Sequence, residues 1–175
     1  TGLGNRRYLE AKLNQFNQEA YLPLAVIIGD ANGLKLVNDA FGHFIGDKLL
    51  IKIAEAIKSA CRSDDHIFRY GGDEFIVLLP NTSETEAEKI SKRIHQACSE
   101  IQIGSVKFSM SLGWAVKKNP DDNLMEIIMV AENFMYKRKE CDRPFLKEDI
   151  IQKIMDSLEL NVESEKLHSE HVSDM

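Results

Sequence analysis

The sequence predicts an α/β protein of the α+β kind, in which a largely antiparallel central sheet is flanked by helices. Residues 24–28 form a short apolar run bounded by proline and glycine, which is typical of a buried central strand. Two β-rich stretches, 67–70 and 74–79, surround a Gly-Gly pair, and this pattern indicates a hairpin. Amphipathic stretches of helical period alternate with these strands along the chain.

The remaining elements follow from apolar periodicity. A strand is expected over residues 106–116, and one more helical pattern follows Pro144, over residues 147–160. Four amphipathic helices are predicted over residues 5–20, 47–61, 84–98 and 124–139. The order helix, strand, helix, hairpin, helix, strand, helix therefore precedes the proline.

The length of 175 residues suits one domain with an extension. We place the boundary near residues 143–147, which divides the chain into a domain over 1–146 and a C-terminal helix and tail over 147–175. The chain begins with Thr1 rather than methionine, so we expect it to be a piece of a longer protein.

Composition narrows the class of protein. The net charge of −6 argues against a nucleic-acid binder, although local basic residues can still hold a nucleotide. Three scattered cysteines indicate reduced thiols and make zinc improbable. The sequence shows neither a secretion signal nor an apolar run long enough for a membrane span. We therefore expect this segment to be cytoplasmic and without membrane contact, whether or not the whole protein is membrane-anchored.

Acidic residues stand at two structurally special places. Asp30 follows the apolar strand, and Asp73 and Glu74 follow the Gly-Gly pair. Taken singly, Asp30 fits a turn or helix cap, and the other two fit a solvated hairpin tip. If the hairpin lies beside the strand, Asp30 and Asp73 converge into an oxygen-rich site of the kind that Mg²⁺ prefers. Two such ions can bridge an attacking hydroxyl and a departing pyrophosphate.

Several short motifs in this sequence resemble those of a known protein family. Residues 70–75 read YGGDEF, which contains the GGDEF motif of bacterial diguanylate cyclases. Four companion segments occur in the order and spacing of that family: 1–7 (TGLGNRR), 30–47 (DANGLKLVNDAFGHFIGD), 109–113 (SMSLG) and 131–139 (AENFMYKRK). The resemblance runs from residue 1 to about 143 and implies a nucleotidyl cyclase fold similar to a polymerase palm.

The resemblance implies roles at the carboxylates. Asp30 and Asp73 would hold Mg²⁺ or Mn²⁺, with the Ala31 carbonyl as a further ligand. Glu74 would sit at the reacting centre, as a metal ligand or as the base for a 3′-hydroxyl.

The resemblance also implies a GTP site. Asn38 and Asp47 would read the guanine edge, and the main chain near Leu34 and Lys35 would cradle the phosphates. Lys139 and Arg143 would hold the terminal phosphates. Without the family, the last two would fit a solvated basic helix end equally well.

A second ligand site is implied by Arg62 and Asp65, an R-x-x-D placed just before the hairpin. In the family this motif binds the product cyclic di-GMP and inhibits the enzyme. Arginine can stack on guanine and pair with it, and aspartate can accept from it. The alternative is a short solvated loop.

Three positions depart from the family pattern. Asn32 replaces the second acid of D-x-D, Leu34 replaces a phenylalanine, and Arg138 replaces a small residue. Because Asn32 is not an expected metal ligand, we expect reduced rather than lost function. The retained Asp47 favours guanine over a mixed cyclic dinucleotide.

The tail has two interpretations. Residues 150–158 and 168–172 resemble the first helices of an HD-type phosphohydrolase domain, but they also fit a linker helix with a frayed end. The expected function is condensation of two GTP into cyclic di-GMP across a homodimer. Two alternatives remain: a GTP- or cyclic di-GMP-binding module that controls an HD-type neighbour, and a polymerase-like or mixed-dinucleotide cyclase.

Overall fold

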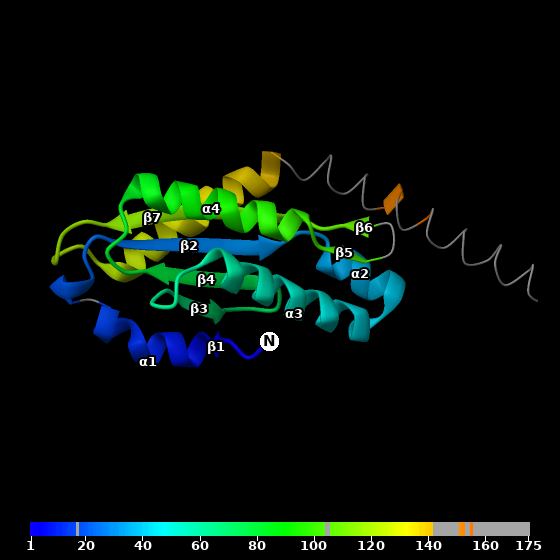
Figure 1. Cartoon of the computed structure of the whole chain (residues 1–175), viewed down its shortest axis with the longest axis horizontal. Helices are drawn as coiled ribbons and strands as arrows, with labels where there is room; N and C mark the ends of the chain where they lie inside the picture. Colours follow the sequence, from blue (N-terminus) through cyan, green and yellow to red (C-terminus); the bar gives the residue numbers. More distant parts are fainter. Residues whose placement is uncertain (17, 104–105, 142–150, 153–154, 156–175) are drawn as a thin grey trace, which may run out of the picture.

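The computed structural model describes residues 1–16, 18–103, 106–141, 151–152 and 155. Its centre is a five-stranded sheet in the order β1-β3-β4-β2-β7 (Figure 1). β1 runs parallel to β3, and the other neighbours are antiparallel. The strands are β1 (Gly4–Asn5), β2 (Leu24–Ala31), β3 (His66–Arg69), β4 (Glu74–Leu79) and β7 (Met110–Lys117). The predicted sheet flanked by helices is confirmed, with one parallel pair at its edge.

Helices cover both faces of the sheet. One face, called here the α3 face, carries α2 (Leu34–Phe41), α3 (His43–Ala60) and α4 (Glu84–Ser99). The opposite face, called the α1 face, is covered by α1 (Arg6–Phe16) and by the helix of residues 124–141. In Figure 1, α3 and α4 cross the front of the sheet. The sheet is therefore the middle of three layers.

The central strand β2 is buried along its whole length, because both of its faces meet a helical layer. Its side chains alternate between the two cores: Leu24, Val26 and Ile28 pack on the α1 face, whereas Ala25 and Ile27 pack on the α3 face. The same alternation places Asp30 on the α1 face.

Three predicted elements differ in detail. The first helix ends at Phe16, and a 3₁₀ turn (η1, Glu19–Tyr21) then leads to a cis peptide before Pro23. The helix predicted to begin at residue 47 begins at His43, after the unpredicted α2. Gly42, with φ of +80°, separates these two helices.

The strand expected over residues 106–116 is divided. β6 (Val106–Lys107) pairs with β5 (Gln102–Ile103) in a small separate hairpin, and β7 begins at Met110. The helix expected over residues 147–160 falls largely outside the described residues, of which 151, 152 and 155 are helical. Within the described part of the chain, no helix is long and apolar enough to cross a membrane.

Candidate active site

The predicted acids meet where β2 ends. β4 lies beside β2 in antiparallel register, and Glu74 stands directly opposite Asp30. The Ala31 N–H donates to the Asp73 carbonyl at 3.0 Å, which ties the hairpin turn to the end of β2. The sequence argument required the hairpin to lie beside the first buried strand, and it does. Directly opposed residues of two strands project from the same face, so Asp30 and Glu74 share the α1 face.

The Gly-Gly turn is held by hydrogen bonds to main-chain carbonyl oxygens. The Tyr70 N–H donates to the Glu74 carbonyl at 2.8 Å, and the Arg69 guanidinium donates to the Gly72 carbonyl at 2.7 and 3.2 Å. A Cβ at Gly71 would lie 2.6 Å from Glu74 Oε2, whereas one at Gly72 would meet no atom within 4 Å. Gly71 therefore makes room for the glutamate, and the space beside Gly72 is open to a ligand.

A lysine from the opposite end of the chain reaches these acids. Lys139 Nζ lies 2.6 Å from Asp30 Oδ1, an ion pair between the helix of residues 124–141 and β2. Asp30 is only 5 % exposed, and no other donor among the described residues satisfies this oxygen. The sequence placed Lys139 at the phosphates of a substrate. In this structure its ammonium neutralises the buried carboxylate of Asp30, and its role at the phosphates stays a prediction.

Negative charge is crowded at this point. Burial raises the pKa of Asp30, which the hydrogen bond from Lys139 opposes and the neighbouring Asp73 reinforces. Burial also raises the pKa of Glu74, and Asp30, Asp73 and Glu132 add to the increase. The contribution of Glu132 was not predicted from the sequence. A bound divalent cation would relieve this repulsion between carboxylates.

The donor set fits Mg²⁺ or Mn²⁺, because these hard cations take oxygen ligands and need only one or two carboxylates beside a substrate. Within the described residues, no group of three His, Cys, Asp or Glu side chains is placed to hold a metal ion. Two carboxylates with a main-chain carbonyl, as the sequence suggested for Asp30, Asp73 and Ala31, are thus the set to consider.

Asn32 is engaged in a neutral hydrogen-bond network. Its Nδ2 donates to Ser109 Oγ at 3.0 Å, and its Oδ1 accepts from Ser111 Oγ at 3.1 Å. Its main-chain N–H also donates to the Ser109 carbonyl at 3.1 Å. Ser109 directly precedes β7 and Ser111 lies on it, and this spacing of two residues was the signal in the sequence that could have revealed them. The network holds the end of β2 against β7.

The predicted guanine-reading residues lie on α2 and α3. A Cβ at Gly46 would collide with Asn38 Oδ1, so the Asn38 carboxamide lies against the first turns of α3, next to the exposed Asp47. At the start of α2, Leu34 is buried and Lys35 is exposed. Arg143, the second predicted phosphate ligand, lies outside the described residues.

Comparison with known proteins identifies the family. The family model described as diguanylate cyclase, GGDEF domain, matches residues 1–144. The chain belongs to this family.

Relatives with curated descriptions agree with this assignment. The bifunctional diguanylate cyclase/cyclic di-GMP phosphodiesterase MucR of Pseudomonas aeruginosa is 39 % identical over 150 residues, covering 82 % of this chain and 22 % of that protein. Diguanylate cyclase DosC of Escherichia coli is 35 % identical over 152 residues, covering 82 % of this chain and 33 % of that protein. The chain thus spans a third or less of each.

A solved structure agrees as well. The GGDEF domain of YfiN from Pseudomonas aeruginosa superposes with a TM-score of 0.70 at 32 % identity, covering 79 % of this chain and 91 % of that one. The sheet flanked by helices is therefore the architecture of GGDEF domains, and the predicted family and fold are confirmed.

The R-x-x-D of this GGDEF domain lies on a separate cleft of about 410 Å³, lined also by residues 2–4. The Arg62 N–H donates to Asp65 Oδ2 at 2.6 Å, and Arg62 Nη2 lies 3.9 Å from Glu86 Oε1. Asp65 Oδ1 is buried and has no hydrogen-bond partner among the described residues. Burial raises the pKa of Asp65. The cleft therefore carries Arg62 beside a buried Asp65 oxygen that lacks a hydrogen-bond partner among the described residues.

Proposed function

We propose that this GGDEF domain is a diguanylate cyclase, which condenses two GTP into cyclic di-GMP and releases two pyrophosphates. The convergence of Asp30, Asp73 and Glu74 at the end of β2 is the observation that carries the proposal. Like charges gathered at a buried position destabilise a fold, so their presence favours a cation-dependent chemical role over passive binding.

Each of the two identical steps forms one phosphodiester bond. The 3′-oxygen of one GTP attacks the α-phosphorus of the other, the bond between that phosphorus and the β-phosphate oxygen breaks, and pyrophosphate departs. The 3′-hydroxyl proton passes to Glu74, whose raised pKa suits a general base. No oxidant or further reactant is needed.

Asp30, Asp73 and the Ala31 carbonyl would hold Mg²⁺ or Mn²⁺. The bound cation supplies charge stabilisation for the attacking and leaving oxygens. Lys139, whose side chain is about one-third exposed, is placed to exchange its contact with Asp30 for the terminal phosphates, together with Arg143. The protein otherwise acts mainly by positioning groups and neutralising charge.

Substrate recognition is assigned to α2 and α3. The Asn38 carboxamide and the Asp47 carboxylate would pair with the guanine edge, since a carboxylate can accept from its N1–H and 2-amino group. The main-chain N–H groups at the start of α2, near Leu34 and Lys35, would cradle the phosphates, because a helix N-terminus favours anions.

One domain offers one GTP site, so catalysis requires two domains that face each other in two-fold symmetry. We therefore propose a homodimer as the active state. Cyclic di-GMP is also proposed as an inhibitor bound at Arg62 and Asp65, where a rotation of the Asp65 side chain would let its unpaired, buried oxygen accept from guanine. An HD-type domain beginning in residues 147–175 stays a prediction, as does the boundary at residue 146.

Product chromatography after incubation with GTP and Mg²⁺ tests the proposal, with and without a fused dimeriser. Wild type and the control Asp121→Ala, an exposed loop residue, should form cyclic di-GMP and pyrophosphate. Asp73→Ala should form neither, with circular dichroism and melting unchanged. Full activity of Asp73→Ala would refute the metal assignment. A dimerised wild type that binds GTP in calorimetry but makes no product would point to a nucleotide-sensing module.

A further inference from the structure

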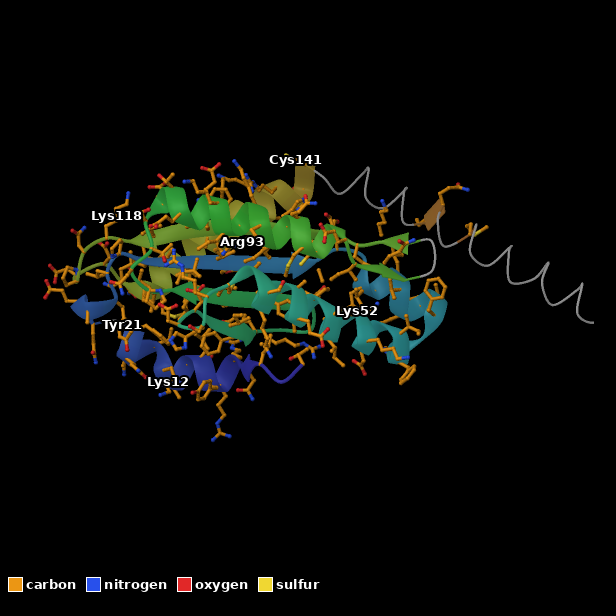
Figure 2. All side chains as sticks on the ribbon, viewed as in Figure 1. Lys12, Tyr21, Lys52, Arg93, Lys118 and Cys141 are labelled. Carbon is orange, nitrogen blue, oxygen red and sulfur yellow. The ribbon has the colours of Figure 1, made fainter. Side chains whose placement is uncertain are left out.

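A second cleft lies on the side of the edge strand β7 that faces away from β2, where α4 and the helix of residues 124–141 flank this strand. It is one strand away from the catalytic acids, because Ser111 in its lining is the register partner of Asp30. Its volume is about 590 Å³, which is within the range of small-molecule sites. Cys141, labelled in Figure 2, is the last described residue of the second helix and also lines the cleft. The floor is formed by Met110, Ser111 and Leu112.

Hydrogen bonding shows which way the floor residues face. The Asn32 N–H donates to the Ser109 carbonyl, which directly precedes β7. The register of β2 and β7 continues this pattern, so the odd-numbered residues at the start of β7 direct their main-chain N–H and C=O groups toward β2. Alternate residues of an antiparallel strand turn theirs the other way. Met110 and Leu112 therefore direct both N–H and C=O to the outer edge of the sheet.

The acceptors on this edge are already used. His95 Nδ1–H donates to the Met110 carbonyl at 3.1 Å, and Arg138 Nη1 donates to the Leu112 carbonyl at 3.4 Å. No partner for the N–H groups of Met110 and Leu112 is found among the described residues. An edge with free N–H groups and covered carbonyls cannot pair with another strand, which needs both. It instead suits a ligand that only accepts hydrogen bonds.

The charge of the cleft agrees with that conclusion. Lys92, His95, Lys137 and Arg138 line it, and none of its lining residues is acidic, although the chain carries a net charge of −6. Lys92 also pairs with Glu88 at 2.8 Å, so a bound anion would have to draw Lys92 from that contact. The Arg138 guanidinium is held in place, because its Cζ lies 4.7 Å from the ring centroid of Trp114 and 4.9 Å from that of Phe134. Stacking leaves its in-plane N–H groups free to bond an anion.

We propose that this cleft binds a phosphate-bearing small molecule. Phosphoryl oxygens would accept from the N–H groups of Met110 and Leu112 and from the side chains of Lys92, Lys137 and Arg138. The adjoining groove of about 610 Å³, lined by Trp114 and Phe134 and sharing Lys137, would accommodate the rest of the ligand. Because Glu84 and Glu88 also line this groove, that part of the ligand would carry no negative charge. The site goes beyond the proposed cyclase reaction and does not depend on it.

The probe is inorganic pyrophosphate without divalent cation, and the readout is the pair of ¹H–¹⁵N amide resonances of Met110 and Leu112. In wild type both should shift in a saturable manner. The double variant Lys92→Glu/Lys137→Glu should bind roughly tenfold or more weakly, since two charge-assisted contacts are lost. The matched control is Lys52→Glu/Lys58→Glu, whose residues lie on α3 and outside this cleft; Lys52 is labelled in Figure 2. It should bind as wild type does.

Lys139→Met separates this site from the active site, because it removes the cation beside Asp30 and leaves the cleft intact. Retained shifts in Lys139→Met support the proposal. Three results overturn it: unmoved Met110 and Leu112 resonances, binding that survives the double charge reversal, or binding that disappears in Lys139→Met. Tighter binding of a hexaglutamate peptide than of pyrophosphate would assign the cleft to an acidic protein segment instead.

Discussion

Gly113 is the point at which the helix of residues 124–141 rests directly on the sheet. A Cβ at this position would lie 2.8 Å from Met135 Cα, and closer still to Met135 N and the Ala131 carbonyl. All three are main-chain atoms, so no side-chain rotation can relieve the overlap. Ordinary contact begins at 3.4 Å and the two nearest of these atoms would lie 2.2 Å away, so Gly113→Ala must push the helix away by about 1.2 Å (3.4 − 2.2).

The displacement has a cost in stability and a consequence at the site. Overpacking of this kind costs about 1–3 kcal/mol, which lowers Tm by roughly 2–12 °C for a chain of this size. The same helix carries Lys139, whose ammonium lies 2.6 Å from Asp30. A misplacement near 1 Å can lower a rate about a hundredfold. We therefore expect kcat/KM for GTP to fall on the order of tenfold.

Thermal melting and steady-state turnover of a dimerised protein measure the two effects. Gly72→Ala is the control for stability, because its added methyl meets no atom within 4 Å. Gly113→Ala with the Tm of wild type would refute the close seating of the helix on the sheet. A lowered Tm with unchanged kcat/KM would retain the seating but refute the requirement for Lys139 at that position.

Two further predictions concern the carboxylates. Burial and neighbouring acids raise the pKa of Glu74 in the folded protein. The ionised carboxylate therefore destabilises the fold at a pH above this raised pKa. At a pH below the ordinary pKa of about 4.3 the carboxyl is protonated in both states, and the destabilisation disappears. Glu74→Gln should therefore raise Tm at pH 8 but not at pH 4 while abolishing turnover, and equal melting at both values would contradict the shift. Arg62→Ala should relieve inhibition by added cyclic di-GMP with little change in initial rate, and inhibition curves that match wild type would remove Arg62 and Asp65 from the inhibitory site.

The parts of the fold that could be predicted from sequence are those set by local patterns. The apolar run of β2 and the Gly-Gly hairpin are short-range signals, and both elements formed where expected. α2 was missed because it has only eight residues and lies between Gly33 and Gly42. Both glycines have positive φ, and glycines flanking so short a segment predict a loop. The division of the strand expected over 106–116 was missed because its apolar alternation continues through the break.

The side-chain contacts of the site depend on packing between distant segments. The sequence motifs identified Asp30, Asp73 and Glu74 as site residues. That Glu74 lies directly opposite Asp30 is determined by the register of β2 and β4. The Lys139–Asp30 ion pair requires the helix of residues 124–141 to rest on Gly113, a tertiary contact that periodicity does not encode. Local patterns therefore identify which residues act, and packing determines which of them touch.

The replacement of the family acid by Asn32 becomes understandable in terms of charge. Asp73 already raises the pKa of Asp30, Asp30 and Asp73 raise the pKa of Glu74, and Lys139 is the basic side chain paired with Asp30. A fourth carboxylate, placed at the buried position 32, which is 7 % exposed, would add to that repulsion. The neutral carboxamide holds the end of β2 through Ser109 and Ser111 without adding charge. Because Asp30 and Asp73 remain available to a cation, this departure is compatible with catalysis and does not by itself mark a domain that only binds nucleotide.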